Sequence, residues 1–186
     1  MKIGIDFDDT IVDQLKDIVD ILNKKRGYNI KFRDITHWKW LREEYPITKE
    51  ELLTEIYDYN PCWCQPTDSR IAKYFNLISA EHIVDVVTAR IGPPYLPHLI
   101  YDTLIKFGLK HIHNLIIVKN TWKQDLKYDV LVDDHPLMTE NVIANGNNVK
   151  IILYTQPWNK YIDCDKYENV YRAKNWRQVY EIIKSL

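Results

Sequence analysis

The residues with the clearest chemical potential lie near the start of the chain, where positions 6–10 read Asp-Phe-Asp-Asp-Thr after a short apolar run. Three carboxylates this close repel one another unless a cation lies between them, and hard oxygen ligands favour Mg²⁺. The same residues also fit a plainer role, an acidic turn in which Asp9 or Thr10 is the N-cap of a helix that starts near Ile11. This stretch alone leaves both a metal site and a helix cap open.

Hydroxyl, acidic and basic groups accompany later apolar runs in a similar way. Thr88 closes one run, Asp133 and Asp134 close another, and Lys123 lies ten residues before Asp133. Because parallel strands with right-handed crossovers bring their carboxyl ends to one edge of a sheet, we expect these groups to meet there. Carboxylates for a cation and as nucleophile, with a hydroxyl and a lysine for phosphate oxygens, together describe phosphoryl transfer.

Apolar runs alternate with helical patterns along most of the chain, which predicts a mostly parallel sheet covered on both faces. The predicted fold class is therefore α/β, with a Rossmann-like core. Strands are expected at 3–7, 82–87, 115–118, 129–132, 149–153 and 169–172. Helices are expected from near Ile11 to Gly27, over 71–78, over 101–109, from Pro136 to about 145, and from a cap at Asn175 onward.

This alternation is interrupted between residues 28 and 66, a stretch rich in aromatic side chains. Within it, Thr48 and Glu51 have the spacing of a capping box and predict the start of a helix. We interpret 28–66 as a small helical cap, inserted after the first strand and helix and lying over the mouth of the site. The core then comprises residues 1–27 and 67–186.

The aromatic residues of this cap fit two roles. A nucleobase stacked on an aromatic face contributes about 1–3 kcal/mol, whereas large aromatic side chains also dominate small cores. The core role is favoured for any single residue, but we expect at least one of the set to face a ligand, Trp38 and Trp40 first. The other members are Tyr57, Tyr59 and Trp63.

Composition narrows the classes of function. The 186 residues carry a net charge of −1 and no basic block. This balance argues against binding to duplex nucleic acid. No stretch approaches the length of a transmembrane span, so no membrane partner is expected. Three cysteines, an odd and small number, favour a reducing cytoplasm. The sequence does not predict the oligomeric state.

The ordered set of motifs resembles the haloacid dehalogenase (HAD) superfamily of phosphohydrolases. The stretch 6–10 is similar to the first motif of that superfamily, Asp-x-Asp-x-Thr. Thr88 is similar to the second motif, Lys123 to the third, and the pair Asp133-Asp134 to the acidic fourth. More narrowly, the chain resembles the 5′(3′)-deoxyribonucleotidase family, through Asp-Ile-Thr-x-Trp at 34–38 and Gln-Pro-Trp-Asn at 156–159.

The resemblance implies a mechanism and a metal. Asp6 would attack phosphorus and form an aspartyl-phosphate, while Asp8 would act first as general acid and then as general base. Mg²⁺ would bridge Asp6, the backbone carbonyl of Asp8 and Asp133, with Asp134 and Thr10 in support.

The resemblance also implies which residues hold the transferred phosphoryl group, namely Thr88 and Lys123. Lys119 and Lys127 compete with Lys123, and only the spacing in the family selects among them. Arg90 departs from the residues that the mammalian enzymes of this family carry after the threonine. Arg90 has two possible roles: it contacts a phosphate in the pocket, or it is a loop residue without a role in the site.

Two residues beside this site have structural alternatives. Asp134 fits equally the role of a cap for the helix that follows Pro136. His135, next to the acidic pair, is expected to be structural and not a ligand.

The sequence thus predicts a Mg²⁺-dependent phosphomonoesterase that hydrolyses (deoxy)nucleoside monophosphates. One alternative is an enzyme with the same reaction that acts on another small phosphomonoester or on the end of a nucleic acid. The balanced charge of the chain argues against a nucleic-acid end as substrate. A phospho-aspartate receiver domain also uses an acidic pair, a threonine and a lysine, but it lacks the spacing of Asp6 and Asp8 and a later acidic pair. A catalytically inactive binding protein is the third alternative, although every motif position is filled.

Overall fold

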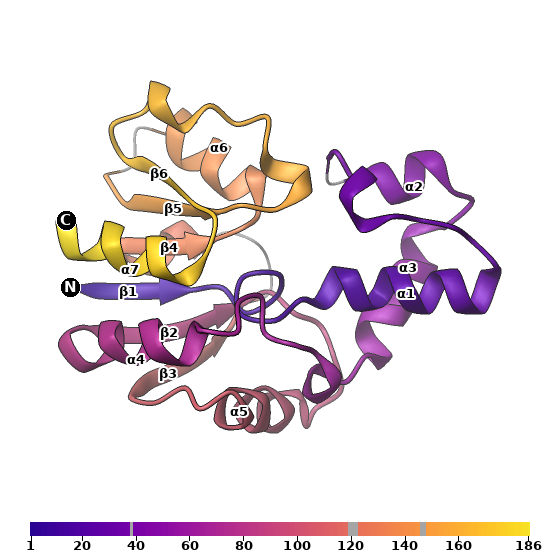
Figure 1. Cartoon of the computed structure of the whole chain (residues 1–186), viewed down its shortest axis with the longest axis horizontal. Helices are drawn as coiled ribbons and strands as arrows, with labels where there is room; N and C mark the ends of the chain where they lie inside the picture. The colour runs from indigo at the N-terminus through magenta and orange to yellow at the C-terminus, as the bar shows by residue number, and fades with distance from the viewer. Residues whose placement is uncertain (38, 119–122, 146–147) are drawn as a thin grey trace.

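The computed structural model describes every residue except 38, 119–122 and 146–147 (Figure 1). The predictions for Trp38 and Lys119 therefore lie outside the described residues. No helix in the described part of the chain is long and apolar enough to cross a membrane.

The described residues form a six-stranded sheet with the strand order β3-β2-β1-β4-β5-β6 (Figure 1). Every pair of neighbouring strands in it is parallel. The expected α/β class and Rossmann-like core are confirmed. The strands are β1 (Lys2–Ile5), β2 (Ile83–Thr88), β3 (Ile112–Ile117), β4 (Val130–Asp133), β5 (Lys150–Tyr154) and β6 (Val170–Ala173).

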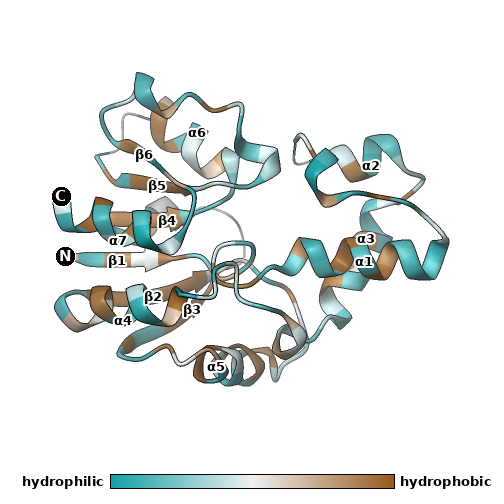
Figure 2. Ribbon diagram, in the orientation of Figure 1, coloured by the Kyte–Doolittle hydropathy of each residue, from teal (hydrophilic) through white to brown (hydrophobic). Residues whose placement is uncertain are grey.

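Helices cover both faces of the sheet, because its central strands are apolar on both sides. Alternate residues of the strands, such as Ile5 and Val132, pack with α4 (Ile71–Glu81), α5 (Leu96–Lys106) and α7 (Trp176–Ser185). The opposite set packs with α6 (Pro136–Ala144). In Figure 2 the helices α4 and α7 show brown and teal bands, the pattern of amphipathic helices on a sheet.

The remaining α-helices project from the edge of the sheet at which the strands end, opposite the two chain termini (Figure 1). They are α1 (Gln14–Arg26), α2 (Trp40–Glu44) and α3 (Lys49–Asp58), the last of which begins with the expected capping box. Apolar residues of α1 pack with the segment that contains α2 and α3 and with Trp158 from the core. The cap limits of 28–66 stay a prediction, and from this packing we propose that the cap unit also includes α1.

Two chain segments join the cap unit to the sheet, and they pair with each other. The backbone N–H of Asp13 donates to the carbonyl of Gln65 at 3.0 Å, and that of Thr67 donates to Ile11 at 3.0 Å. Val12 and Pro66 form an isolated antiparallel bridge between these hydrogen bonds. The entry and exit segments therefore form a short two-stranded connection directly beside the end of β1.

The start of α1 corrects one sequence prediction. The helix begins at Gln14, not near Ile11, because residues 8–12 form a turn that is closed by a bridge between Asp8 and Val12. The N-cap position is Asp13, whose side chain makes no capping bond. Asp9 nevertheless satisfies one free amide of the first turn, since its Oδ1 accepts from the backbone N–H of Leu15 at 2.8 Å.

Candidate active site

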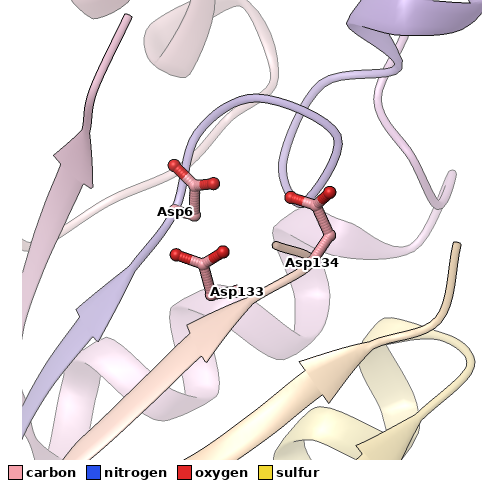
Figure 3. Close-up of side chains that lie close together, drawn as sticks. All are labelled: Asp6, Asp133 and Asp134. Carbon is pink, nitrogen blue, oxygen red and sulfur yellow. The ribbon is translucent and has the colours of Figure 1, made fainter. Parts of the chain in front are cut away.

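Three buried carboxylates gather at the carboxyl edge of the sheet. Asp6 follows β1, whereas Asp133 ends β4 and Asp134 follows it (Figure 3). Because β1 and β4 pair in parallel with Ile5 opposite Val132, these acidic residues come next to one another. One oxygen from each carboxylate lies within 4.8 Å of the others. The predicted meeting of Asp6 with the acidic pair is therefore present.

Lys123 supplies a positive charge between two of these carboxylates. Its Nζ lies 2.6 Å from Oδ1 of Asp6 and 2.7 Å from Oδ2 of Asp133, and its side chain is buried. Lys127, a competing candidate, is exposed and lines a surface hollow with Asp129, away from this cluster. Of these two lysines, only Lys123 reaches the acidic site.

The electrostatics of the cluster favour an additional cation. Burial raises the pKa of Asp6 well above its usual range, and the neighbouring carboxylates reinforce this shift while Lys123 opposes it. Burial likewise raises the pKa of Asp134, with added repulsion from Asp9 and Asp133. Burial lowers the pKa of Lys123, but its ion pairs with Asp133 and Asp6 outweigh that effect and raise it overall. One ammonium does not balance several buried carboxylates, and their oxygen atoms fit a hard divalent ion.

Asp134 is held by side chains from two other segments. Trp158 Nε1 donates to its Oδ2 at 2.9 Å, and Thr10 Oγ1 donates to its Oδ1 at 3.3 Å. The alternative in which Asp134 caps the following helix is wrong, because the N-cap of α6 is His135. His135 Nδ1 accepts from the backbone N–H of Leu137 at 3.2 Å, in line with the structural role expected for this histidine.

Asp8 lies beside the acidic cluster and is bound from the end of β2. Thr88 Oγ1 donates to Asp8 Oδ2 at 3.2 Å, and Arg90 Nη1 lies 2.5 Å from Asp8 Oδ1. The Arg90 side chain is buried and is not a loop decoration. The sequence analysis named both residues as candidates but did not predict that they pair, because they lie far apart in the chain.

The side chains line a candidate catalytic pocket of about 310 Å³, whose walls include Asp6, Asp8, Arg90, Lys123 and Asp133. A second, largely apolar pocket of about 180 Å³ lies among the cap helices. The two pockets share four lining residues and therefore adjoin. These shared residues are Asp9, Gln14, Leu53 and Ile56.

The cap aromatics do not line either pocket, as far as the described residues show. Trp40 packs on Tyr45 with ring centroids 5.7 Å apart and belongs to the cap core. Trp63 is 66% exposed, and Tyr57 lines a separate surface hollow that also contains Arg90. The ligand-facing role expected first for Trp40 is therefore not supported by its position.

Gln14 and Trp158 are among the pocket residues that the sequence prediction of the site did not name. Gln14 is the first residue of α1 and is buried although it is polar. Its position on the apolar face of the helix was the one sequence feature that could have indicated a role in the pocket. Trp158 lines the apolar pocket and binds Asp134. It belongs to the Gln-Pro-Trp-Asn pattern, but nothing local indicates which way its ring points.

Known proteins resemble this chain in fold and in sequence. A hydrolase of the haloacid dehalogenase-like family from Xanthomonas campestris has a similar structure, with a TM-score of 0.57 at 11% identity over 100% of this chain and 95% of that one. A HAD-superfamily hydrolase of subfamily IA from Geobacter sulfurreducens has a TM-score of 0.54 at 13% identity, over 98% and 95% of the two chains. These likenesses establish the fold.

Sequence comparison gives the family. A protein from Bacillus cereus described as "Putative nucleotidase" is 25% identical over an alignment of 203 positions, which covers 99% of this chain and 98% of that protein. The family model described as 5′ nucleotidase, deoxy (pyrimidine), cytosolic type C protein matches residues 1–186. The chain therefore belongs to this deoxyribonucleotidase family, and it has the fold of the HAD-like hydrolases.

Proposed function

We propose that the protein is a Mg²⁺-dependent phosphomonoesterase that hydrolyses deoxynucleoside monophosphates to nucleoside and phosphate. The observation that carries this proposal is the position of Lys123 between Asp6 and Asp133. A nucleophilic carboxylate, a buried cation and a second carboxylate at one sheet edge are the groups that phosphoryl transfer requires. Membership in a nucleotidase family supports the choice of substrate.

In the proposed reaction, an oxygen of Asp6 attacks phosphorus, and the bond between phosphorus and the ester oxygen breaks. The electron pair leaves with that oxygen, which takes a proton from Asp8. Water then attacks the aspartyl-phosphate while Asp8 accepts a proton from it, so that phosphate leaves and Asp6 is regenerated. Such acid–base assistance contributes about a hundred- to ten-thousand-fold.

The residues that would hold Mg²⁺ are Asp6, Asp133 and Asp134 together with the backbone carbonyl of Asp8. When bound, the ion would screen the repulsion between the attacking carboxylate and the anionic phosphate. Lys123, which lies beside Asp6, and Thr88, whose hydroxyl donates to Asp8 in this structure, are proposed to bind the phosphoryl oxygens. Donors fixed in advance around these oxygens stabilise the charge of the transition state without reorganisation.

The nucleoside is proposed to occupy the space between the sheet edge and the cap. The catalytic pocket adjoins the apolar pocket through Gln14, Leu53 and Ile56, which gives room for a sugar and a base beyond the phosphate. We propose no duplex nucleic acid and no membrane as partner. The free thiols of Cys62, Cys64 and Cys164 support a cytoplasmic location.

Phosphate release tests this function. The panel comprises deoxynucleoside and nucleoside monophosphates and sugar phosphates, each with Mg²⁺ and with EDTA. Metal-dependent release from deoxynucleotides is expected. Release from sugar phosphates alone would keep the chemistry and reject the nucleotide substrate, and no release from any compound would reject the phosphatase function.

A further inference from the structure

Arg90 joins the end of β2 to two parts of the molecule that are distant in sequence. Its Nη1 lies 2.5 Å from Asp8 Oδ1, and its Nη2 donates to the backbone carbonyl of Tyr59 at 2.7 Å. The guanidinium carbon also lies 5.7 Å from the centre of the Tyr59 ring. Only 5% of Arg90 is exposed, so these contacts form largely out of water, where they are strong.

Tyr59 is anchored to the cap unit and follows directly after α3. Its hydroxyl donates to Asp17 on α1 at 2.5 Å and accepts from the thiol of Cys64 at 3.2 Å. It lies in the chain that leaves the cap, six residues before Gln65, where the pairing with residues 11–13 begins. Arg90 therefore contacts a carbonyl that lies between the end of α3 and the paired connection.

Gln14 closes the arrangement from α1. In the orientation that satisfies both ends of its amide, its nitrogen donates to Asp8 Oδ1 at 3.0 Å and its oxygen accepts from Arg90. Oδ1 of Asp8 thus has two partners, Arg90 and Gln14. Oδ2 of Asp8 receives only the longer hydrogen bond from Thr88, at 3.2 Å, among the contacts seen in the described residues.

We propose that Arg90 is a positioning residue that fixes Asp8 for proton transfer and couples its position to the exit segment of the cap at Tyr59. The proposal rests on the function proposed above. With Oδ1 held by Arg90 and Gln14, Oδ2 is the oxygen of Asp8 left to face the leaving group. The guanidinium fork can hold a carboxylate and a carbonyl at once, which a lysine ammonium does with less directional control.

The first test compares leaving groups. Proton donation matters for a nucleoside alkoxide, a poor leaving group, and little for p-nitrophenolate. The value of kcat/KM with Mg²⁺ is measured for a deoxynucleoside monophosphate and for p-nitrophenyl phosphate. In Arg90→Gln it is expected to fall about a hundredfold or more for the nucleotide but less than about tenfold for the aryl ester. Arg90→Lys should recover part of the loss on the nucleotide alone.

The matched control is Arg177→Gln, which removes an exposed arginine paired with Glu181 on α7 and should leave both values unchanged. Equal losses on the two substrates in Arg90→Gln, with a wild type active on both, would overturn the role of Arg90 and leave the proposed function intact. A wild type inactive on both substrates would overturn the proposed function and this role together.

The second test measures the coupling to Tyr59 in the absence of substrate. Hydrogen exchange is followed in wild type, Arg90→Lys and Arg90→Gln. Amides of the paired connection, including those of Asp13 and Thr67, are expected to exchange faster in Arg90→Gln, while those of α7 keep their rates. Unchanged exchange at the connection in both variants would overturn the coupling. If Arg90→Gln does not fold, the exchange rates at the connection in wild type and Arg90→Lys decide whether Arg90 is coupled to it.

Discussion

The Nζ atom of Lys123 lies 2.6 Å from Oδ1 of Asp6, with both side chains buried at the carboxyl edge of the sheet. The same ammonium lies 2.7 Å from Asp133, so one cation is shared by the proposed nucleophile and a proposed metal ligand. This sharing keeps Asp6 close to a positive charge even though burial raises its pKa. The ion pair opposes the rise in the pKa of Asp6 but does not outweigh burial, so a further cation would be needed to favour the ionised form that nucleophilic attack requires.

Asp6→Asn should remove phosphatase activity without unfolding the protein. The change keeps the side-chain volume but replaces the attacking carboxylate with a neutral amide. We expect a loss of about a thousandfold or more in kcat, as is typical when a nucleophile is removed. The measurement is phosphate release, accompanied by a thermal melt, and the control is Asp125→Asn at an exposed position. Near-native turnover in Asp6→Asn would contradict the proposed mechanism.

Stabilisation by Mg²⁺ should increase with pH. The pKa of Asp134 is raised by burial, so this carboxyl binds its proton more tightly in the folded than in the unfolded chain. The same holds for Asp6. Without metal, these groups therefore cost stability progressively as the pH rises above about 4 through their raised pKa values. A divalent ion binds the ionised carboxylates and removes that cost.

The corresponding measurement is the difference in melting temperature between Mg²⁺ and EDTA. We expect this difference to grow as the pH rises above about 4. Asp134→Asn should reduce the dependence, because it removes one of the carboxyls with a raised pKa. A difference that stays constant with pH would show that these carboxyls do not bind the ion.

The core and its acidic edge were predictable because their signals are local. Each strand is an apolar run, and the residue that follows a parallel strand must lie at the carboxyl edge, so Asp6, Thr88 and Asp133 were correctly expected there. Caps obey equally local rules, as Asn175 shows by accepting from the backbone N–H of Gln178 at the start of α7.

The partners of amphipathic surfaces were not predictable in the same way. The apolar face of α1 predicts that Ile18 and Leu22 are buried, but it does not say whether a sheet or the cap helices bury them. Arg90 and Asp8 lie 82 positions apart, and only the assembled sheet edge makes them an ion pair. The aromatic content of the cap likewise did not distinguish Trp40, which packs on Tyr45, from a residue that faces a ligand.

Trp158→Phe should weaken metal binding while the ring continues to fill its buried site. The change removes the indole N–H that donates to Asp134 Oδ2 at 2.9 Å. Loss of a hydrogen bond that orients a metal ligand typically lowers metal affinity by about 10- to 100-fold. Activity titrated with Mg²⁺ gives this affinity, and Trp63→Phe, at a 66% exposed position, is the control. Equal Mg²⁺ affinities in Trp158→Phe and Trp63→Phe would show that Asp134 is not part of the metal site.

Leu53→Trp should distinguish the phosphate end of the site from the nucleoside end. Leu53 lies on α3 and lines both the catalytic and the apolar pocket, where a larger ring would occupy space proposed for the nucleoside. A change of one methylene in the size of a substrate pocket alters binding by about 1–3 kcal/mol, so KM for deoxynucleotides should rise about tenfold or more with this larger ring. Hydrolysis of acetyl phosphate, which has no nucleoside, should be unaffected. Ile105→Trp, at a 69% exposed position on α5, is the control. A similar rise in KM for both substrates would mean that Leu53 acts on the phosphate end, and an unchanged KM for both would place the nucleoside outside these pockets.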